Sequence, residues 1–118
     1  SEIRSLCEIP ILSGDDSLTL PLISIGAVGV VSVASNLIPR QIKELVQLAL
    51  SRDFPSAAEL HRKLFPLFRA LFMDGNPGGI KFAMQLAGLD SGQMRLPVYE
   101  VNPATQEAIT RQWKRLNT

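Results

Sequence analysis

The sequence predicts an α/β fold in which two parallel strands, joined by a helix, precede a segment that is mostly helical to the end of the chain. Three observations predict it. Residues 9–12 are short and apolar and end at a turn signal, residues 18–25 have helix-like spacing of Leu and Ile, and residues 29–33 are rich in valine. A strand, helix and strand in this order form a right-handed βαβ unit. Strands that are apolar on both faces are typical of buried parallel sheets.

The turn after the first predicted strand contains two adjacent acidic residues, Asp15 and Asp16. Together with Ser17 they can cap the helix over 18–25, because their side-chain oxygens accept orphan amide protons. Pro21 is tolerated in the first turn of that helix. The acidic pair could instead serve metal binding or acid-base chemistry. The favoured interpretation is a helix N-terminus stabilised by negative charge.

Beyond Asn36 the pattern predicts helices. Pro39 suits a first turn, and an apolar stripe follows at helical spacing: Ile42, Leu45, Val46 and Ala49. The next helix is predicted to begin at a capping box formed by Ser56 and Glu59. It carries two apolar stripes, made of Leu60, Leu64, Leu67 and Leu71 with Phe65, Phe68 and Phe72 beside them. Pro66 should kink it.

The last third contains a glycine-rich loop over residues 75–79 and a short helix over 80–87 that stops at Gly88. Residues 96–98 are predicted to be extended. Asn102 caps a final helix with Pro103 at its first position. The buried face of that helix is predicted to consist of Ile109, Trp113 and Leu116.

Composition is that of a globular domain without a strong charge. The 118 residues are 46% apolar and 19% charged, with a formal net charge of +1, which favours neither nucleic acid nor an anionic membrane as a partner. Cys7 is the single cysteine and is predicted to be a small buried hydrophobe, and a reducing compartment is expected. No secretory signal is expected. The basic side chains are predicted to lie on solvated helix faces.

One uncharged stretch, residues 17–39, is long enough to be tested as a membrane span. Pro21 and Gly26 interrupt it, and its serines and Asn36 make it too polar. A membrane hairpin is therefore the weakest interpretation. The predicted strand pair raises a different problem, because two buried-type strands leave open edges when they stand alone. The pattern indicates the end of a larger sheet.

Five motifs support that view because they occur in one order along the chain. They are Ser13-Gly14-Asp15-Asp16; residues 29–33 with Asn36, Pro39 and Arg40; residues 64–72 with Pro66; Asn76-Pro77 with Lys81; and Arg95-Leu96-Pro97. Together they resemble the C-terminal portion of dihydrodipicolinate synthases, which are pyruvate-dependent class I aldolases. The Ser-Gly-Asp-Asp sequence favours these enzymes over N-acetylneuraminate lyases, which share their barrel and chemistry.

The resemblance implies the last two strands of a (β/α)8 TIM barrel followed by a C-terminal helical extension. Residues 1–52 would form the two barrel units and residues 53–118 the extension. Such barrels need about 250 residues. The family condenses pyruvate with aspartate semialdehyde in lysine and diaminopimelate biosynthesis. Its Schiff-base lysine and proton relay lie upstream of Ser1, so we expect no catalytic residue in this chain and no activity from the chain alone.

Two substrate-binding positions carry over from the family. Gly14 matches the glycine at the top of the seventh strand, where the backbone lies against pyruvate. Val31 matches an eighth-strand residue whose carbonyl faces the Schiff base. Without the resemblance, Gly14 would be a turn glycine and Val31 a core valine. The resemblance also implies no cofactor and no metal, a cytoplasmic location, a missing N-terminal barrel segment as partner, and a homo-oligomer.

Other candidates receive structural interpretations. Lys43, Lys63 and Lys114 have charged neighbours, and Lys81, between Ile80 and Phe82, is the one lysine with an apolar setting. His61 has no cluster of metal ligands beside it. The family usually has a proline where this chain has Gly78-Gly79, which is predicted to loosen that loop. A second class of function remains open, a self-associating helical interaction module built on residues 60–72.

Overall fold

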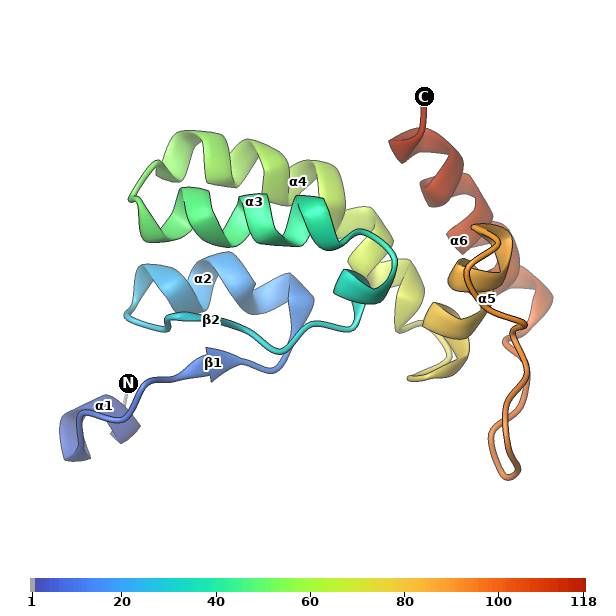
Figure 1. The fold of residues 1–118 in the computed structure, drawn as a ribbon, viewed down its shortest axis with the longest axis horizontal. Coiled ribbons are helices and arrows are strands. Elements are labelled where there is room, and N and C mark those ends of the chain that lie inside the picture. Colours follow the sequence, from blue (N-terminus) through green and yellow to red (C-terminus); the bar gives the residue numbers. More distant parts are fainter. Residues whose placement is uncertain (1) are drawn as a thin grey trace.

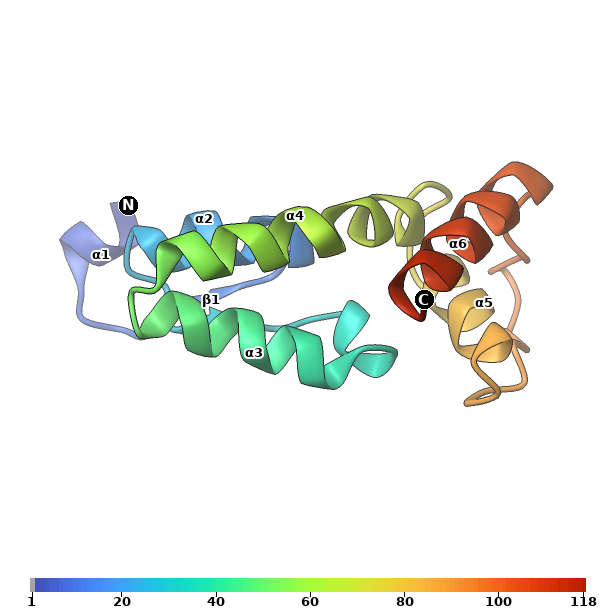
Figure 2. The ribbon, with the colours of Figure 1, turned by 90° about the horizontal axis from the view of Figure 1, so that it is seen from above.

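A computed structural model describes residues 2–118, and Figures 1 and 2 show the arrangement of its helices and strands. A long α4 runs beside α3, the two short strands and α2 lie at one end, and α5 and α6 lie at the other. In chain order the elements are α1 (Glu2–Leu6), β1 (Leu12–Ser13), the 3-10 helix η1 (Asp16–Leu18), α2 (Thr19–Ser24), β2 (Gly29–Val30), the 3-10 helix η2 (Ala34–Asn36), α3 (Pro39–Leu50), α4 (Phe54–Leu71), α5 (Gly78–Leu86) and α6 (Pro103–Leu116).

The predicted strand pair is confirmed as parallel, with Leu12 opposite Gly29 and Ser13 opposite Val30. Both strands are shorter than the predicted ranges 9–12 and 29–33. The first continues into Ser13, which was predicted to be in the turn. The second ends early because the amide of Val33 bonds to a side chain, the carboxylate of Asp16, instead of a neighbouring strand. The strands are short because each has a single strand neighbour.

Two helix starts differ from prediction. The helix predicted over 18–25 is divided into η1 and α2, and Asp15 caps η1 by accepting from the backbone N–H of Ser17 at 2.7 Å. The capping box at Ser56 is wrong. Helix α4 begins three residues earlier, and Asp53 caps it by accepting from the backbone N–H of Ser56 at 3.2 Å. Asn102 caps α6 as predicted, accepting from the N–H of Thr105 at 2.9 Å.

The glycine-rich segment also differs from prediction. Gly78 and Gly79 form the first turn of α5 and are buried, so they do not loosen a loop. The reason is close packing, because a Cβ at Gly79 would overlap the carbonyl of Leu71 at the end of α4. Residues 96–98 are not extended. Leu96 and Pro97 form a turn in which the N–H of Val98 donates to the carbonyl of Arg95 at 3.1 Å.

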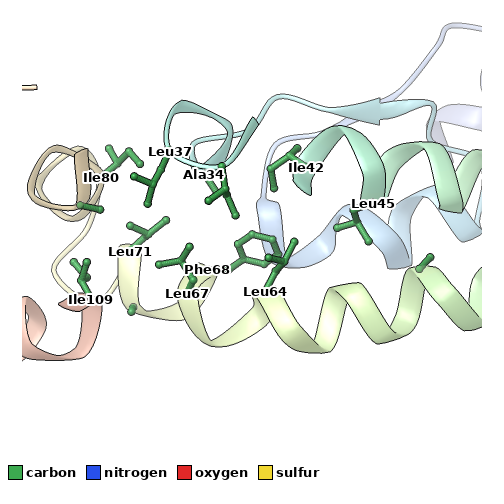
Figure 3. Close-up of a cluster of buried hydrophobic side chains, with 14 of the residues drawn as sticks. Ala34, Leu37, Ile42, Leu45, Leu64, Leu67, Phe68, Leu71, Ile80 and Ile109 are labelled. Atoms are coloured by element: carbon green, nitrogen blue, oxygen red, sulfur yellow. The ribbon is translucent and has the colours of Figure 1, made fainter. Parts of the chain in front are cut away.

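The hydrophobic core fills the space between α4 and the elements around it, as Figure 3 shows. The predicted stripe of α3 is buried at Ile42, Leu45 and Ala49 and half-buried at Val46. Helix α4 continues through Pro66, and its largest fully buried side chains are Leu64, Leu67, Phe68 and Leu71. Ile109 anchors α6 in the same core, with Trp113 and Leu116 packed beside it as predicted.

Surface predictions are mostly confirmed. The basic side chains predicted to be solvated are exposed: Arg40, Lys43, Arg52, Arg62, Lys63, Arg69, Lys114 and Arg115. Cys7 is a correction, because it is exposed at the end of α1 and not buried. Its position follows from α1, which buries no residue. Across residues 2–118, the helices lack the combination of length and apolar character that a bilayer crossing requires.

His61 on α4 has a half-buried ring beside Phe65 and Phe68, at centroid distances of 5.6 and 6.4 Å. Its Nδ1 is buried without a hydrogen-bond partner. Burial of the ring, aided by the positive charge of Arg62, lowers the pKa of His61 below its usual value of 6.5. As the pH falls through 6.5, the unfolded chain therefore takes up a proton before the folded chain does.

We expect the free energy of unfolding to decrease as the pH falls below 6.5, because protonation of His61 favours the unfolded chain. Urea unfolding at pH 7.5 and pH 5.5, followed by circular dichroism, measures the change. His61→Gln removes the titrating ring, so the variant should lose less stability between the two pH values. An equal loss in both proteins would contradict the assignment to His61.

Candidate functional site at the strand ends

The two parallel strands end side by side, which brings the two predicted site residues to one end of the sheet. Gly14 follows Ser13 at the end of β1, and Val31 follows Val30 at the end of β2. The N–H of Val31 donates to the carbonyl of Ser13 at 2.8 Å, so the two chain segments remain paired at this point. In (β/α)8 barrels the chemistry occurs at this end of the strands.

Gly14 and Val31 are both accessible from outside the chain. A Cβ added at Gly14 would meet no atom within 4 Å, and the side chain of Val31 is 67% exposed. Gly14 does not have the left-handed backbone conformation that favours glycine, so the turn itself does not require a glycine here. Val31 is not a core valine in this chain. A small ligand could reach the backbone at either position.

Asp16 connects the two strand ends from inside the fold. Its side chain is buried, and its Oδ2 accepts from the backbone N–H groups of Val33 at 3.1 Å and Ala34 at 2.9 Å. Its Oδ1 accepts a hydrogen bond from the hydroxyl of Ser32. Asp16 therefore does more than place negative charge at a helix N-terminus. It holds the loop after β1 against the loop after β2.

Sequence reasoning missed this role of Asp16 because the contact spans 16 to 18 residues. The available signal was an acidic residue after one predicted strand and a serine near the end of the next. The carboxyl ends of neighbouring parallel strands lie at the same edge of a sheet, so a pairing of these two strands brings the two residues close.

The turn itself is fixed by local hydrogen bonds. The hydroxyl of Ser13 donates to the carbonyl of Asp15 at 2.7 Å and accepts from its N–H at 3.2 Å. The carboxylate of Asp15 accepts from both the N–H and the hydroxyl of Ser17, at 2.7 and 2.6 Å. These bonds use the polar groups of the turn internally. The backbone at Gly14 is held in place without a side chain of its own.

A groove of about 480 Å³ opens beside this turn. It is lined by Asp15 and Ser17 from the turn, by Phe68 and Arg69 of α4, and by Phe72 and Met73 directly after α4. The groove combines apolar surface with one guanidinium and one carboxylate. Such a mixture suits a small polar molecule better than a purely apolar one.

The described residues at the strand ends include no lysine, so none of them can form an imine with a carbonyl compound. Lys81 lies on α5, and its Nζ donates to both oxygens of Asp90 at 2.7 and 2.8 Å. This hydrogen bond from Lys81, with a second from the N–H of Gly92, lowers the pKa of Asp90. Lys81 is thus paired with a carboxylate, which agrees with its structural interpretation although its neighbours in the sequence, Ile80 and Phe82, are apolar. Lys43, Lys63 and Lys114 are exposed.

Among residues 2–118, no three His, Cys, Asp or Glu side chains are grouped to hold a metal.

The chain matches known proteins over nearly all of its length. The model of the Dihydrodipicolinate synthetase family matches residues 3–116. The 4-hydroxy-tetrahydrodipicolinate synthase of Methanococcus maripaludis is 48% identical over 101 residues, which are 86% of this chain and 35% of that protein. The 4-hydroxy-tetrahydrodipicolinate synthase 1 of Halalkalibacterium halodurans is 49% identical over 106 residues, 90% of this chain and 36% of that protein.

Comparison with solved structures also finds dihydrodipicolinate synthases. The 4-hydroxy-tetrahydrodipicolinate synthase of Methylacidiphilum fumariolicum superposes with a TM-score of 0.90 at 46% identity, covering 93% of this chain and 37% of that one. The Aquifex aeolicus dihydrodipicolinate synthase gives a TM-score of 0.89 at 43% identity, covering 92% and 37%.

The chain thus spans little more than a third of its relatives' length. The predicted fold class, two parallel strands of a (β/α)8 barrel followed by helices, is confirmed by these barrels and by the observed topology. All of the relatives described above are synthases, as the Ser-Gly-Asp-Asp motif predicted. The chain belongs to the dihydrodipicolinate synthetase family.

Proposed function

We propose that the chain is the C-terminal portion of a 4-hydroxy-tetrahydrodipicolinate synthase. Residues 1–52 would supply the last two β/α units of the barrel and residues 53–118 the helical extension. The whole enzyme would condense pyruvate with aspartate semialdehyde in the synthesis of diaminopimelate and lysine. The observation that carries the proposal is the family match over residues 3–116, with 48–49% identity to synthases of that name.

The chemistry divides between this chain and the rest of the barrel. A lysine upstream would attack the carbonyl of pyruvate, release water and form an imine, whose enamine form attacks the aldehyde. The backbone at Gly14 would lie against pyruvate, and the carbonyl of Val31 would face the imine. Support comes from their common end of the sheet and from their exposure. The groove beside Asp15 would then open next to the bound substrates.

A chimera tests this function. The H. halodurans synthase 1 is produced with its matching segment replaced by this chain, and treated with pyruvate and borohydride. Intact-mass measurement should find one reduced pyruvate adduct, and condensation with aspartate semialdehyde should follow. Lys81→Arg in the chimera is the matched control, because it retains the charge that pairs with Asp90 and should leave the adduct unchanged.

This chain alone should gain no adduct. An adduct on the isolated chain, lost in Lys81→Arg, would mean that the Schiff-base lysine is here and that the proposed division is wrong. A folded chimera that forms the adduct but cleaves N-acetylneuraminate, and does not condense aspartate semialdehyde, would reassign the substrate. A cytoplasmic location and assembly as a homotetramer belong to the same proposal, and both rest on the family.

A second candidate function is self-association through α4. Its support is the partial exposure of Phe65 on α4 and of Phe72 directly after it, both of which lie outside the core. Such a surface can bind another apolar face. Sedimentation velocity over a range of concentrations distinguishes the monomer from a self-associated form of the chain. A monomer that persists at high concentration would eliminate this candidate.

A further inference from the structure

The carbonyl of Val31 lies between two points at which the backbone is held by hydrogen bonds. On one side, the N–H of Val31 itself donates to the carbonyl of Ser13 at 2.8 Å. On the other side, the N–H groups of Val33 and Ala34 donate to one carboxylate oxygen of Asp16, at 3.1 and 2.9 Å. A planar peptide leaves two soft dihedrals per residue, so bonds this close on either side restrict the direction of the carbonyl between them.

The hydroxyl of Ser32 connects the same carboxylate to the residue that follows this carbonyl. It donates to the second oxygen of Asp16 and accepts from the N–H of Ser35 at 2.8 Å. The hydroxyl of Ser35 donates in return to the carbonyl of Ser32 at 3.0 Å. Residues 32–35 are thus tied to one another and to Asp16 directly beyond the carbonyl of Val31.

Side-chain hydrogen bonds also replace the next pair of bonds in the parallel ladder. Continuation of the register would join the N–H of Asp15 to the carbonyl of Val31, and the N–H of Val33 to the carbonyl of Asp15. Instead, the hydroxyl of Ser13 accepts from the N–H of Asp15 at 3.2 Å. The N–H of Val33 is taken by Asp16. Within residues 2–118 the carbonyl of Val31 therefore accepts no hydrogen bond, which leaves its oxygen available to a ligand.

Asp16 is itself too buried to contact a ligand at the strand ends. It is 2% exposed, whereas Val31 is 67% exposed and a Cβ at Gly14 would meet open space. A molecule bound there would meet the backbone, with the carboxylate of Asp16 behind it. Asp16 can therefore influence chemistry at this place only through the backbone that it holds.

We propose that Asp16 is a positioning residue of the synthase reaction, which holds the carbonyl of Val31 in the direction of the pyruvate imine. This inference rests on the proposed function. A protonated imine is positively charged, and a carbonyl oxygen fixed toward it stabilises that charge without reorganisation. The effect depends on placement, because a displacement of about 1 Å can cost about 100-fold in rate. Loss of Asp16 should therefore slow imine formation in an enzyme that remains folded.

The test introduces Asp16→Ala into the chimera of the H. halodurans synthase 1 that carries this chain. Adduct formation at saturating pyruvate is followed over time by borohydride quenching and intact-mass measurement, at a temperature where circular dichroism shows each protein folded. We expect Asp16→Ala to slow adduct formation about tenfold or more. Asp16→Asn should recover most of the rate, because its amide oxygen still accepts from the N–H groups of Val33 and Ala34.

Leu45→Ala is the matched control for lost stability, because Leu45 is fully buried in α3 and takes no part in these hydrogen bonds. It should leave the rate of adduct formation unchanged. Ser32→Ala is the second variant if Asp16→Ala fails to fold. It removes one of the three bonds to the carboxylate and should slow adduct formation by a smaller factor.

The positioning role would be overturned if the folded Asp16→Ala chimera forms the adduct as fast as the unsubstituted chimera. An equal slowing by Leu45→Ala would overturn it as well, since the effect would then follow stability alone. So would an unchanged rate in Ser32→Ala, where that variant replaces Asp16→Ala. An unsubstituted chimera that forms no adduct would instead refute the proposed function, and this inference with it.

Discussion

Replacing Asp16 with alanine is expected to lower the free energy of unfolding by about 3–5 kcal/mol. The substitution leaves the buried N–H of Ala34, the half-buried N–H of Val33 and the hydroxyl of Ser32 without their acceptor. Each buried donor that loses its partner costs about 1–3 kcal/mol. Urea unfolding of the purified chain at pH 7.5, followed by circular dichroism, measures the loss.

Asp16→Asn is the matched control. Its amide oxygen can still accept from the N–H groups of Val33 and Ala34, and its amide hydrogens can donate to the hydroxyl of Ser32. We therefore expect a loss of about 1–2 kcal/mol, the difference between charge-assisted and neutral hydrogen bonds. If the alanine and asparagine variants unfold at the same urea concentration, Asp16 does not hold the strand ends together.

Local periodicity predicted the parts of the fold whose partners lie nearby in the sequence. The stripe of Ile42, Leu45 and Ala49 is buried because helical spacing alone places these side chains on one face. Asn102 caps α6 because its oxygen needs a donor only three residues away. The parallel pairing of β1 and β2 was predictable for the same reason, since a short crossover constrains it.

Features with distant or competing partners were not predictable in this way. Asp53 and Ser56 both precede apolar residues and both suit a cap, and the choice depends on where α4 meets α3. Gly79 was assigned to a loop because the sequence does not reveal that Leu71 approaches it. The strand lengths also depend on distant partners, because a neighbouring strand at the free edge of β1 would extend its pairing.

The candidate site was predictable only in part, for a related reason. Gly14 and Val31 came from a family pattern, and the sequence alone gave each a plain structural role. Their closeness follows from the sheet, whereas any role toward pyruvate depends on groups elsewhere in the barrel. Asp16 is the converse case, because its importance comes from this chain's own contacts and no motif singles it out.

Replacing Phe68 with alanine is expected to lower the free energy of unfolding by about 3–5 kcal/mol. Phe68 is 2% exposed in the core between α4 and the elements around it, and it also lines the groove beside Asp15. Truncation removes the buried ring and leaves a cavity that close-packed neighbours fill only in part. Urea unfolding monitored by circular dichroism gives the change in stability directly.

Phe65→Ala is the matched control for Phe68→Ala, because it makes the same truncation three residues earlier on α4, where the ring is 39% exposed. Both rings lie near His61, so loss of that contact affects the two variants alike. We expect Phe65→Ala to lose about 1 kcal/mol or less, in line with partial burial. Equal losses would mean that the face of α4 bearing Phe65 is covered in solution, which would support self-association. A small loss at Phe68 would instead mean that packing around this ring contributes little to the stability of the chain.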